Sequence, residues 1–599
     1  MRIEDIERMI ADMPAAQGYL ELATERGDRA YLLGPRTVPE TTPPLLDWRT
    51  APLAEAFFRA APGEPYELEV GERVTAGTVR ARFVIVKHGR LLVGDESVLA
   101  REDGWSERRV PRPAPAAGPQ IDRAALPVLD PEQQRAVDLP ADTSLVIDGE
   151  AGVGKTLVAL YRIAALDRRA REKSRRFRAL VLVPTEGLRR LCRLIADRLG
   201  LAKLEIAVLE TWLVERAHRA FPGLPKRLSE GATAQVIALK RHPALRAVLD
   251  DFIGWKPPKD DEKLARSRAR LLHLFGDRDR LLRVLEAAGG SLPERAIAAV
   301  QKHTRIQFET TTERAHRHVD ADRLVALDGR SLDAGTPTED AHTFDFEDTA
   351  VLFELVRRGA LPKVELPHYD HIVLDEAQLR SPLELAAVGD ALGKHGTVTL
   401  AGDHRQATDE TAYFAGWAAA RTELRRSRWA EVTLAITYRS VPAIGDFARA
   451  VSEARAVLPP DPPPDPAMWA TACDGALAQT AALCWHLDAL ITRDPWRQIA
   501  VIARNPEHAR RLHAELSRGL DPTLVLDGDF RFEPGVIVTT AAAVSGLEFD
   551  AVVVPDLSPA FYPAGPAGEL RRSLYVSATR ARDWLWLLTP ETWSPLVQQ

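Results

Sequence analysis

Gly149-Glu150-Ala151-Gly152-Val153-Gly154-Lys155-Thr156 (GEAGVGKT) fits the pattern GxxxxGK[ST], a glycine-rich turn between a strand and a helix. The apolar run SLVID precedes this stretch and TLVALYRIAAL follows it, so the sequence predicts the strand and the helix that the pattern needs. Glycines let such a loop curl with its N–H groups turned inward, and the helix N-terminus adds positive potential. A loop of this kind binds the phosphates of a nucleotide.

The nucleotide contacts expected from this loop come from Gly149, Gly152, Gly154, Lys155 and Thr156. The Lys155 ammonium can reach the β- and γ-phosphates, and the Thr156 hydroxyl can ligate Mg²⁺. A second element, residues 371–378 (HIVLDEAQ), is an apolar strand that ends in two carboxylates. We expect Asp375 to hold Mg²⁺ through water, and Glu376 to orient and deprotonate the attacking water. ATP and Mg²⁺ are therefore the predicted ligands, and ATP hydrolysis is the predicted reaction.

The nucleotide motif lies in a run of strand–loop–helix units, which predicts a parallel α/β sheet. From Leu129 onward, the apolar strands SLVID, ALVLVP, HIVLDEA and TVTLAGD are separated by loops and helical segments. A helical, highly charged stretch from about 201 to 362 interrupts this pattern and is expected to be an insertion. A second α/β block, 431–599, opens with the strand EVTLAI. The predicted fold class is α/β, with one domain at 121–430 and another at 431–599.

Residues 1–120 are predicted to form a separate, strand-rich module. TVRARFVIV and RLLVGDESVL alternate polar and apolar residues around His88-Gly89, which is the pattern of a β-hairpin. The segment PPLLDWRTAPLAEAFF precedes them. We expect its Trp48 to pack in the core of the module, and a role in binding a partner is the alternative. VPRPAPAAGPQ, rich in proline and alanine, is a semi-rigid spacer and the predicted domain boundary.

The composition is that of a soluble globular protein, with 45% hydrophobic residues, 27% charged residues and a net charge of −6. Dedicated duplex-DNA binders are usually basic, so contact with nucleic acid requires a local patch, or the main partner is a protein. Cys192, Cys473 and Cys484 are far apart and form no CxxC pair, which argues against a cysteine metal site or a disulfide framework. No run of 18 apolar residues occurs. We expect a cytoplasmic monomer without membrane contact.

ATP hydrolysis also requires positive charge on the γ-phosphate from across a cleft. Arg439, after the strand EVTLAI, and Arg580, in LYVSATRARDWLWLL, are the candidates, although an ordinary surface or C-cap arginine has the same sequence pattern. Two basic clusters in the insertion, 302–305 and 314–318, also allow two interpretations. They can contact phosphates, but a solvated helix face is the more common explanation.

Taken together and in order, these motifs resemble those of the UvrD/Rep-like superfamily 1 helicases. Besides the two elements above, the family's other motifs are similar to LDPEQQRAV, VLVPT, GDHRQAT, TYRS, VSGLEFDAVVV and LYVSATRA. The resemblance extends from Leu129 nearly to the end of the chain. It implies two RecA-like domains, 1A and 2A, with ATP and Mg²⁺ bound at their interface.

The same resemblance implies roles for individual residues. Gln133 is expected to read the adenine edge and Tyr438 to stack on adenine. Gln406 is implied as the γ-phosphate sensor, Arg439 as a γ-phosphate contact and Arg580 as an arginine finger. The positions expected near the ribose and phosphates are Gly546 and Glu548.

A narrower resemblance is to the HelD-type proteins, helicase-like ATPases that bind and recycle RNA polymerase. PPLLDWRTAPLAEAFFRAAPGEPYEL resembles that family's DWR segment, and GDHRQAT is more similar to its third motif than to that of UvrD. A helical insertion in 1A, and a distance between TYRS and VSGLEF too short for a 2B domain, are also similar. Leu379, Ser545 and Thr411 depart from the helicase pattern, and no sustained heptads precede the DWR segment.

Three functions are compatible with these observations. The first is a motor that remodels a nucleic-acid complex, with the RNA polymerase core as the partner implied by the HelD resemblance. The second is a 3′–5′ translocase or DNA helicase on single-stranded nucleic acid. The third is a nucleotide-gated binding module that hydrolyses ATP weakly. The DWR segment, the missing room for a 2B domain and the acidic balance favour the first.

Overall fold

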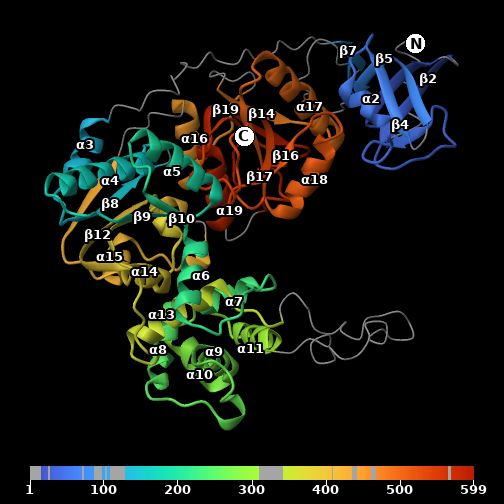
Figure 1. The fold of residues 1–599 in the computed structure, drawn as a ribbon. Helices are drawn as coiled ribbons and strands as arrows, with labels where there is room; N and C mark the ends of the chain where they lie inside the picture. Colours follow the sequence, from blue (N-terminus) through green and yellow to red (C-terminus); the bar gives the residue numbers. More distant parts are fainter. Residues whose placement is uncertain are drawn as a thin grey trace. The chain divides into compact units, whose positions relative to one another are not determined.

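The computed structural model describes residues 15–24, 27–70, 73–85, 98–101, 104–107, 129–150, 152–308, 341–407, 409–434, 441–460, 467–563 and 568–598. The chain divides into two compact units (Figure 1). One unit is Leu126–Ile436, and the other combines Met1–Ala125 with Thr437–Gln599.

Leu126–Ile436 is built around a six-stranded sheet in which all neighbouring strands run parallel. Across the sheet the strands are β10 (Glu205–Val208), β9 (Ala179–Val183), β11 (Tyr369–Leu374), β12 (Leu392–Gly402), β8 (Ser144–Gly149) and β13 (Trp429–Leu434). Every residue of β8 and β9 is buried, as expected for parallel strands covered on both faces. The helices between the strands include α3 (Pro131–Asp138), α4 (Lys155–Glu172), α5 (Glu186–Arg198), α14 (Pro382–Gly389) and α15 (Trp417–Leu424). The predicted parallel α/β sheet is confirmed.

Two strands of this sheet were expected elsewhere. EVTLAI was expected to open the second α/β block, but β13, which contains its first residues, pairs with β8 from Trp429↔Ser144 to Leu434↔Gly149. That assignment was wrong. β10 falls within the range 201–362 expected to be an insertion, yet it pairs with β9. A local pattern predicts a strand, but the choice of partner is a tertiary property that the pattern does not contain.

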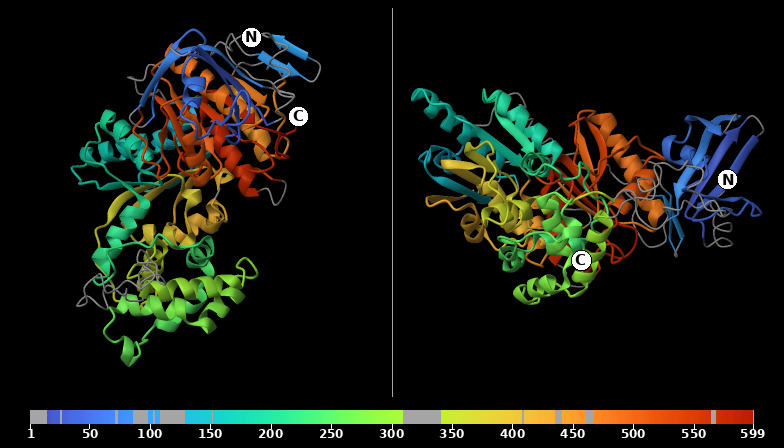
Figure 2. Two further views of the ribbon diagram at one scale, coloured as in Figure 1. Left: turned by 90° about the vertical axis from the view of Figure 1, so that its right-hand side faces the viewer. Right: turned by 60° about the horizontal axis from the view of Figure 1, so that its bottom comes forward.

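The insertion is mainly helical, as its sequence suggested. Its helices are α6 (Leu209–Ala220), α7 (Ala234–Arg241), α8 (Arg246–Leu249), α9 (Arg266–Gly276), α10 (Arg278–Ala287), α11 (Arg295–Phe308) and α13 (Phe346–Arg357). In the left-hand view of Figure 2 the green helices form one group beyond the strands of the sheet. A single hydrophobic core joins them to the sheet, for example through Leu213 of α6 and Val351 of α13. The insertion and the first α/β sheet therefore share one hydrophobic core.

The basic cluster 302–305 of α11 is only partly solvated. Lys302 and Arg305 are exposed, whereas His303 is buried with its Nε2 at 3.0 Å from Asp345 Oδ1. Part of this cluster therefore packs inside the insertion. The second cluster, 314–318, lies outside the described residues.

His371 of β11 is enclosed between two hydroxyl groups of β12. Its Nδ1 lies 2.8 Å from Thr397 Oγ1 and its Nε2 3.1 Å from Thr399 Oγ1, and the residue is fully buried. Burial, with a smaller effect of Arg162, lowers the pKa of His371 from 6.5 to about 3. The folded protein therefore keeps this imidazole neutral at pH values where the unfolded chain protonates it.

We expect this histidine to make the protein less stable in acid. Its contribution is complete above pH 6.5 and is lost as the pH falls toward 3, because only the unfolded state gains the proton. Over that range, His371→Gln should remove about 1.4 kcal/mol of pH dependence per pH unit. Urea unfolding between pH 7 and 4 measures the difference, with His395→Gln at an exposed position of β12 as the reference substitution. Parallel stability curves for the His371 variant and the natural protein would contradict this expectation.

The other unit contains a second all-parallel sheet. Its strands, in spatial order, are β14 (Met468–Ala472), β19 (Ala581–Thr589), β18 (Phe549–Val554), β15 (Gln498–Ala503), β17 (Gly535–Thr540) and β16 (Thr523–Leu524). Its helices are α16 (Pro442–Ser452), α17 (Ala476–Arg493), α18 (Pro506–Leu516) and α19 (Gly568–Thr579). Two parallel sheets are consistent with two RecA-like domains.

The N-terminal module is a mixed sheet that packs on the second α/β domain. Its strands lie in the order β3 (Leu45–Asp47), β2 (Gly27–Gly34), β1 (Gly18–Thr24), β5 (Arg73–Val84) and β4 (Pro65–Val70), with α2 (Ala54–Arg59) beside them. In Figure 1 the module lies next to α17 and α18. Trp485 Nε1 of α17 donates to the Phe58 carbonyl at 3.0 Å, and Arg59 donates to the Ser517 carbonyl at 2.9 Å. One hydrophobic core contains Trp48, Phe58 and Leu477, so module and domain fold together.

The predicted hairpin around His88-Gly89 falls largely outside the described residues. Its first strand is β5, which pairs antiparallel with β1 and with β4. A short antiparallel pair, β6 (Val98–Arg101) and β7 (Gly104–Glu107), follows. The strand-rich character of the module is confirmed.

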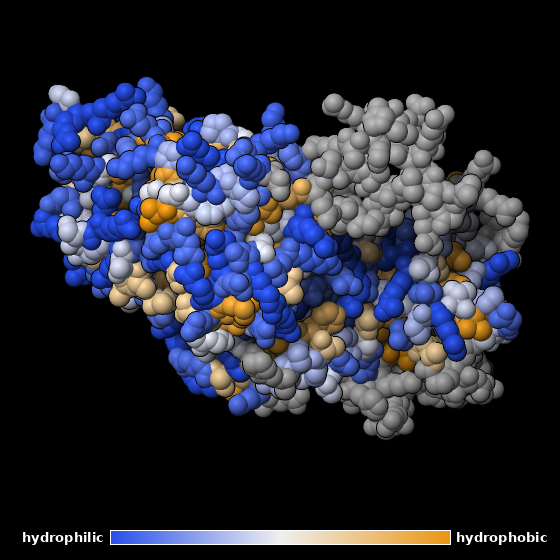
Figure 3. All heavy atoms as spheres, turned by 90° about the horizontal axis from the view of Figure 1, so that it is seen from below, coloured by the Kyte–Doolittle hydropathy of each residue, from blue (hydrophilic) through white to orange (hydrophobic). Residues whose placement is uncertain are grey.

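The described surface is largely hydrophilic on the face shown in Figure 3, and hydrophobic residues are scattered over it. Trp496 has the largest exposed fraction, 75%, among the exposed large hydrophobic side chains of the described residues. None of the described helices is both long enough and apolar enough to cross a membrane.

Candidate nucleotide site

The candidate site forms where three neighbouring strands end. β8 pairs with β12, and β12 pairs with β11, all parallel, so their carboxyl ends lie at one edge of the sheet. GEAGVGKT follows β8, the two carboxylates of HIVLDEAQ follow β11, and Asp403 to Gln406 follow β12. Ligands in open parallel sheets bind at this edge. The sheet order therefore collects residues that are more than 200 positions apart in the chain, such as Thr156 and Asp375.

The phosphate loop requires glycine at three positions for two different reasons. Gly152 and Gly154 have φ angles of 79° and 84°, in the left-handed region that other residues rarely adopt. Gly149 is restricted by space, because an added Cβ would lie 2.7 Å from the Leu434 carbonyl of β13. α4 begins immediately after Gly154, so its N-terminus points into the loop.

Lys155 lies across this loop with only 8% of its surface exposed. Its Nζ donates to the carbonyls of Gly149 and Glu150, both at 2.8 Å. The ammonium group is thus held where the loop curls. A phosphate placed against the loop would have this charge beside it.

Thr156 and Asp375, the two predicted Mg²⁺ ligands, are in direct contact. Thr156 Oγ1 donates to Asp375 Oδ2 at 2.5 Å. Burial and the neighbouring Glu376 carboxylate raise the pKa of Asp375 to about 6. A hydroxyl and a buried carboxylate are the hard oxygen donors that Mg²⁺ prefers, so these residues fit that ion.

Glu376 adopts a backbone conformation that is unusual for its residue type. Its φ is 49°, in the left-handed region, and the residue is buried. Such conformations cost about 1–3 kcal/mol and persist where the surroundings enforce them. Gln378 Nε2 donates to Glu376 Oε2 at 2.5 Å, which orients the carboxylate.

Gln378, which is not among the predicted site residues, also contacts the loop after β12. Its Oε1 accepts a hydrogen bond from the Asp403 N–H at 3.3 Å. An added Cβ at Gly402 would lie 2.1 Å from this oxygen and 2.8 Å from the Trp417 ring. Trp417 is buried, so it packs behind the loop. The position of Gln378 two residues after Glu376 was the available signal.

Gln406, the predicted γ-phosphate sensor, is buried beside Asp403. Its Nε2 donates to Asp403 Oδ2 at 3.1 Å, and Asp403 Oδ1 accepts from the Arg405 N–H at 2.9 Å. Asp403 thus shapes the short helical turn His404–Gln406 and sets the direction of the glutamine amide.

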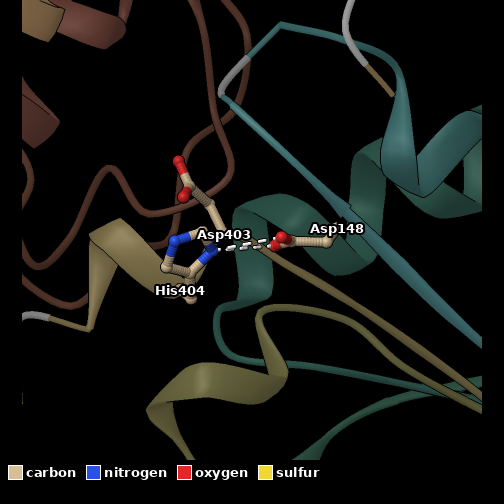
Figure 4. A group of neighbouring side chains, drawn as sticks. All are labelled: Asp148, Asp403 and His404. Carbon is tan, nitrogen blue, oxygen red and sulfur yellow. Dashed lines mark hydrogen bonds and ion pairs between the residues drawn. The ribbon is translucent and has the colours of Figure 1, made fainter. Parts of the chain in front are cut away.

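Two contacts connect this turn to the phosphate loop. His404 Nδ1 lies 3.1 Å from Asp148 Oδ2, at the end of β8 (Figure 4). Arg405 Nη1 pairs with Glu150 Oε1 at 2.5 Å. Asp148, Asp403 and His404 offer ligand atoms that lie within 4.8 Å of one another, but both acidic residues already have hydrogen-bond partners. We interpret the group as a structural link between the two loops.

Gln133 lies against the phosphate loop. Its Nε2 donates to the Val153 carbonyl at 2.9 Å, and its Oε1 accepts from the Asp130 N–H at 3.1 Å in a capping box at the start of α3. Recognition of adenine by Gln133 stays a prediction. Arg162 of α4, which is not among the predicted site residues, donates to the Thr143 carbonyl at 2.7 Å in the segment between α3 and β8.

The remaining predicted site residues belong to the other unit. Tyr438 and Arg439 lie outside the described residues. Arg580 is buried, and its guanidinium donates to the Leu547 carbonyl at 3.2 Å. This contact places Arg580 beside the loop of Gly546, whose φ is 74°, and Glu548. The roles of these residues toward a nucleotide stay predictions.

Part of the second α/β domain is similar to a known protein family. Residues 535–588 match the family model of the UvrD-like helicase C-terminal domain. A solved structure of the C-terminal domain of a possible DNA helicase from Lactobacillus plantarum WCFS1 is 26% identical, covers 27% of this chain and 92% of that chain, and has a TM-score of 0.22. No curated protein matches the chain. The matched segment runs from β17 into β19 and includes Gly546, Glu548 and Arg580, so this part of the second α/β domain is similar to the UvrD-like helicase C-terminal domain.

Proposed function

We propose that this chain is a superfamily 1 helicase-like ATPase that uses ATP hydrolysis to remodel a nucleic-acid complex. The observation that carries the proposal is the contact between Thr156 and Asp375, 2.5 Å apart at the edge where Lys155, Glu376 and Gln406 also lie. A glycine-rich loop after β8 that contacts a carboxylate after β11, with β12 between the two strands, is the arrangement that nucleotide hydrolysis needs. The UvrD-like helicase C-terminal domain supports the same class of activity.

Each side chain has a distinct part in the proposed reaction. Lys155 and the loop N–H groups would bind the β- and γ-phosphates. Thr156 and Asp375 would hold Mg²⁺, which would supply positive charge to the phosphate oxygens. Glu376, oriented by Gln378, accepts the proton of the attacking water. From the second α/β domain, Arg439 and Arg580 are proposed to stabilise the γ-phosphate during transfer.

Single-stranded nucleic acid is the partner proposed first, because the matched family is a helicase family. RNA polymerase core is the alternative, and it rests on the HelD resemblance alone. Trp48 of the DWR segment is fully buried within its own unit, so its side chain is not offered to a partner. A polymerase contact would have to use other residues.

ATP turnover measured alone, with single-stranded DNA and with RNA polymerase core tests the proposal. Turnover with EDTA in place of Mg²⁺ provides the background rate. Stimulation by DNA only supports a translocase or helicase, and stimulation by polymerase only supports a remodelling factor of the HelD type. A rate equal to background under all conditions would overturn the ATPase and leave a nucleotide-gated binding module.

A further inference from the structure

Arg241, the last residue of α7, joins the helical insertion to two loops of the candidate site. Its guanidinium donates from Nε to Glu384 Oε1 at 2.8 Å and from Nη2 to the Leu379 carbonyl at 2.9 Å. Its Nη1 donates to Thr411 Oγ1 at 2.8 Å and pairs with Asp409. All five donors of an arginine fork point in fixed directions, so these partners are held in one arrangement.

The partners of Arg241 come from the segments that follow β11 and β12. Leu379 lies three residues after Glu376, and α14 with Glu384 follows it. Asp409 lies three residues after Gln406. A single side chain of the insertion therefore contacts both segments that position the proposed catalytic carboxylate and the proposed phosphate sensor.

Core packing alone does not explain why charged side chains are buried around Arg241. The Arg241 side chain is 8% exposed and that of Glu384 is 1% exposed. Glu384 and Asp409 raise the pKa of Arg241 against the effect of burial, so the charge is retained. Buried ion pairs are often no more stabilising than apolar residues of similar size, and their best-established use is to fix one geometry.

We infer that Arg241 is a positioning residue that couples the helical insertion to ATP hydrolysis. It does so by holding the segments after β11 and β12 in a fixed position relative to α7. A force on the insertion would then shift the Glu376 carboxylate and the Gln406 amide together. This inference rests on the proposed ATPase function, because it concerns the efficiency of the same site.

Lys240, the neighbouring residue of α7, provides a matched control. Its side chain is 1% exposed and pairs with Asp345 and Asp348 of the insertion, at 2.5 and 2.7 Å. No described contact of Lys240 reaches the segments after β11 or β12. A loss of insertion stability should therefore follow from Lys240→Met as well as from Arg241→Gln.

The test compares kcat and KM for ATP, and the midpoint of thermal unfolding, in both variants. Arg241→Gln is expected to lower kcat about 10- to 100-fold with KM changed less than about threefold, because misplaced catalytic groups affect the chemical step. Lys240→Met is expected to lower the unfolding midpoint while kcat per folded molecule stays within about twofold of the natural chain. Equal losses of kcat in both variants, or an unchanged kcat in Arg241→Gln, would overturn the inference.

A second variant and a second measurement extend the test to the case in which Arg241→Gln does not fold or the natural chain does not hydrolyse ATP. Asp409→Asn removes the ion pair between Arg241 and the segment after β12 but leaves the contacts of Arg241 with Glu384, Leu379 and Thr411 in place. The Asp409 side chain is 37% exposed, so this variant serves if Arg241→Gln does not fold. Amide hydrogen exchange of 376–384 and 403–412 reports loop order without ATP, and it should accelerate in Arg241→Gln but not in Lys240→Met. If the natural chain shows no ATP turnover but exchange is faster in Arg241→Gln than in the natural chain, the proposed function is refuted and the positional role of Arg241 is retained. Unchanged exchange would refute that role.

Discussion

Lys155→Ala is expected to abolish ATP turnover, with a loss of about 10³-fold, the order produced by removing a cation from the transferred phosphate. The physical reason is the position of Nζ, which donates to the carbonyls of Gly149 and Glu150 inside the phosphate loop. Alanine leaves those carbonyls and a bound phosphate without a positive partner. The measurement is steady-state ATP hydrolysis, together with equilibrium binding of a fluorescent ATP analogue, which should weaken as well.

Glu376→Gln is the matched comparison, because it removes a charge from the same site without removing a phosphate contact. Turnover should fall about 10²- to 10⁴-fold, whereas nucleotide binding should be retained. Retained turnover in Lys155→Ala, or equal losses of binding in both variants, would show that the nucleotide is held elsewhere. Thermal unfolding of both variants separates a chemical loss from a folding defect.

Trp48→Ala is expected to destabilise the unit that contains the second α/β domain by about 3–5 kcal/mol, the usual cost of truncating a buried tryptophan. Trp48 is fully buried, its ring centroid lies 6.0 Å from that of Phe58, and the same core includes Leu477 of α17. Truncation would open a cavity in a core shared by the module and the domain. Urea unfolding followed by far-UV circular dichroism measures the effect.

Trp496→Ala provides the control, since this tryptophan is 75% exposed in the same unit and should change stability by less than about 0.5 kcal/mol. Similar stability of the two variants would mean that the DWR segment does not support the domain core. The expected result instead gives the DWR segment an internal role. A polymerase contact by this segment would then have to use side chains other than Trp48.

The motifs of the site were predictable because each depends on a short stretch of chain. A glycine-rich turn with lysine and threonine, and a strand ending in two carboxylates, have their chemistry written in neighbouring residues. Gln378 and Arg241 could not be assigned in this way. Their importance comes from partners such as Asp403, 25 positions away, and Glu384, 143 positions away.

The sequence by itself determined the class of fold and predicted the glycine-rich loop and the acidic pair Asp375 and Glu376, because local patterning and turn chemistry are properties of consecutive residues. Tertiary structure decided which strand lies beside which. It assigned β13 and β10 to the first sheet, placed the DWR segment in a core with α17, and brought α7 to the segments after β11 and β12. The physical reason is that a strand or side chain can pair or pack with many other parts of the chain. Which of these partners is most favourable depends on the whole folded chain and is not written in any short stretch of sequence.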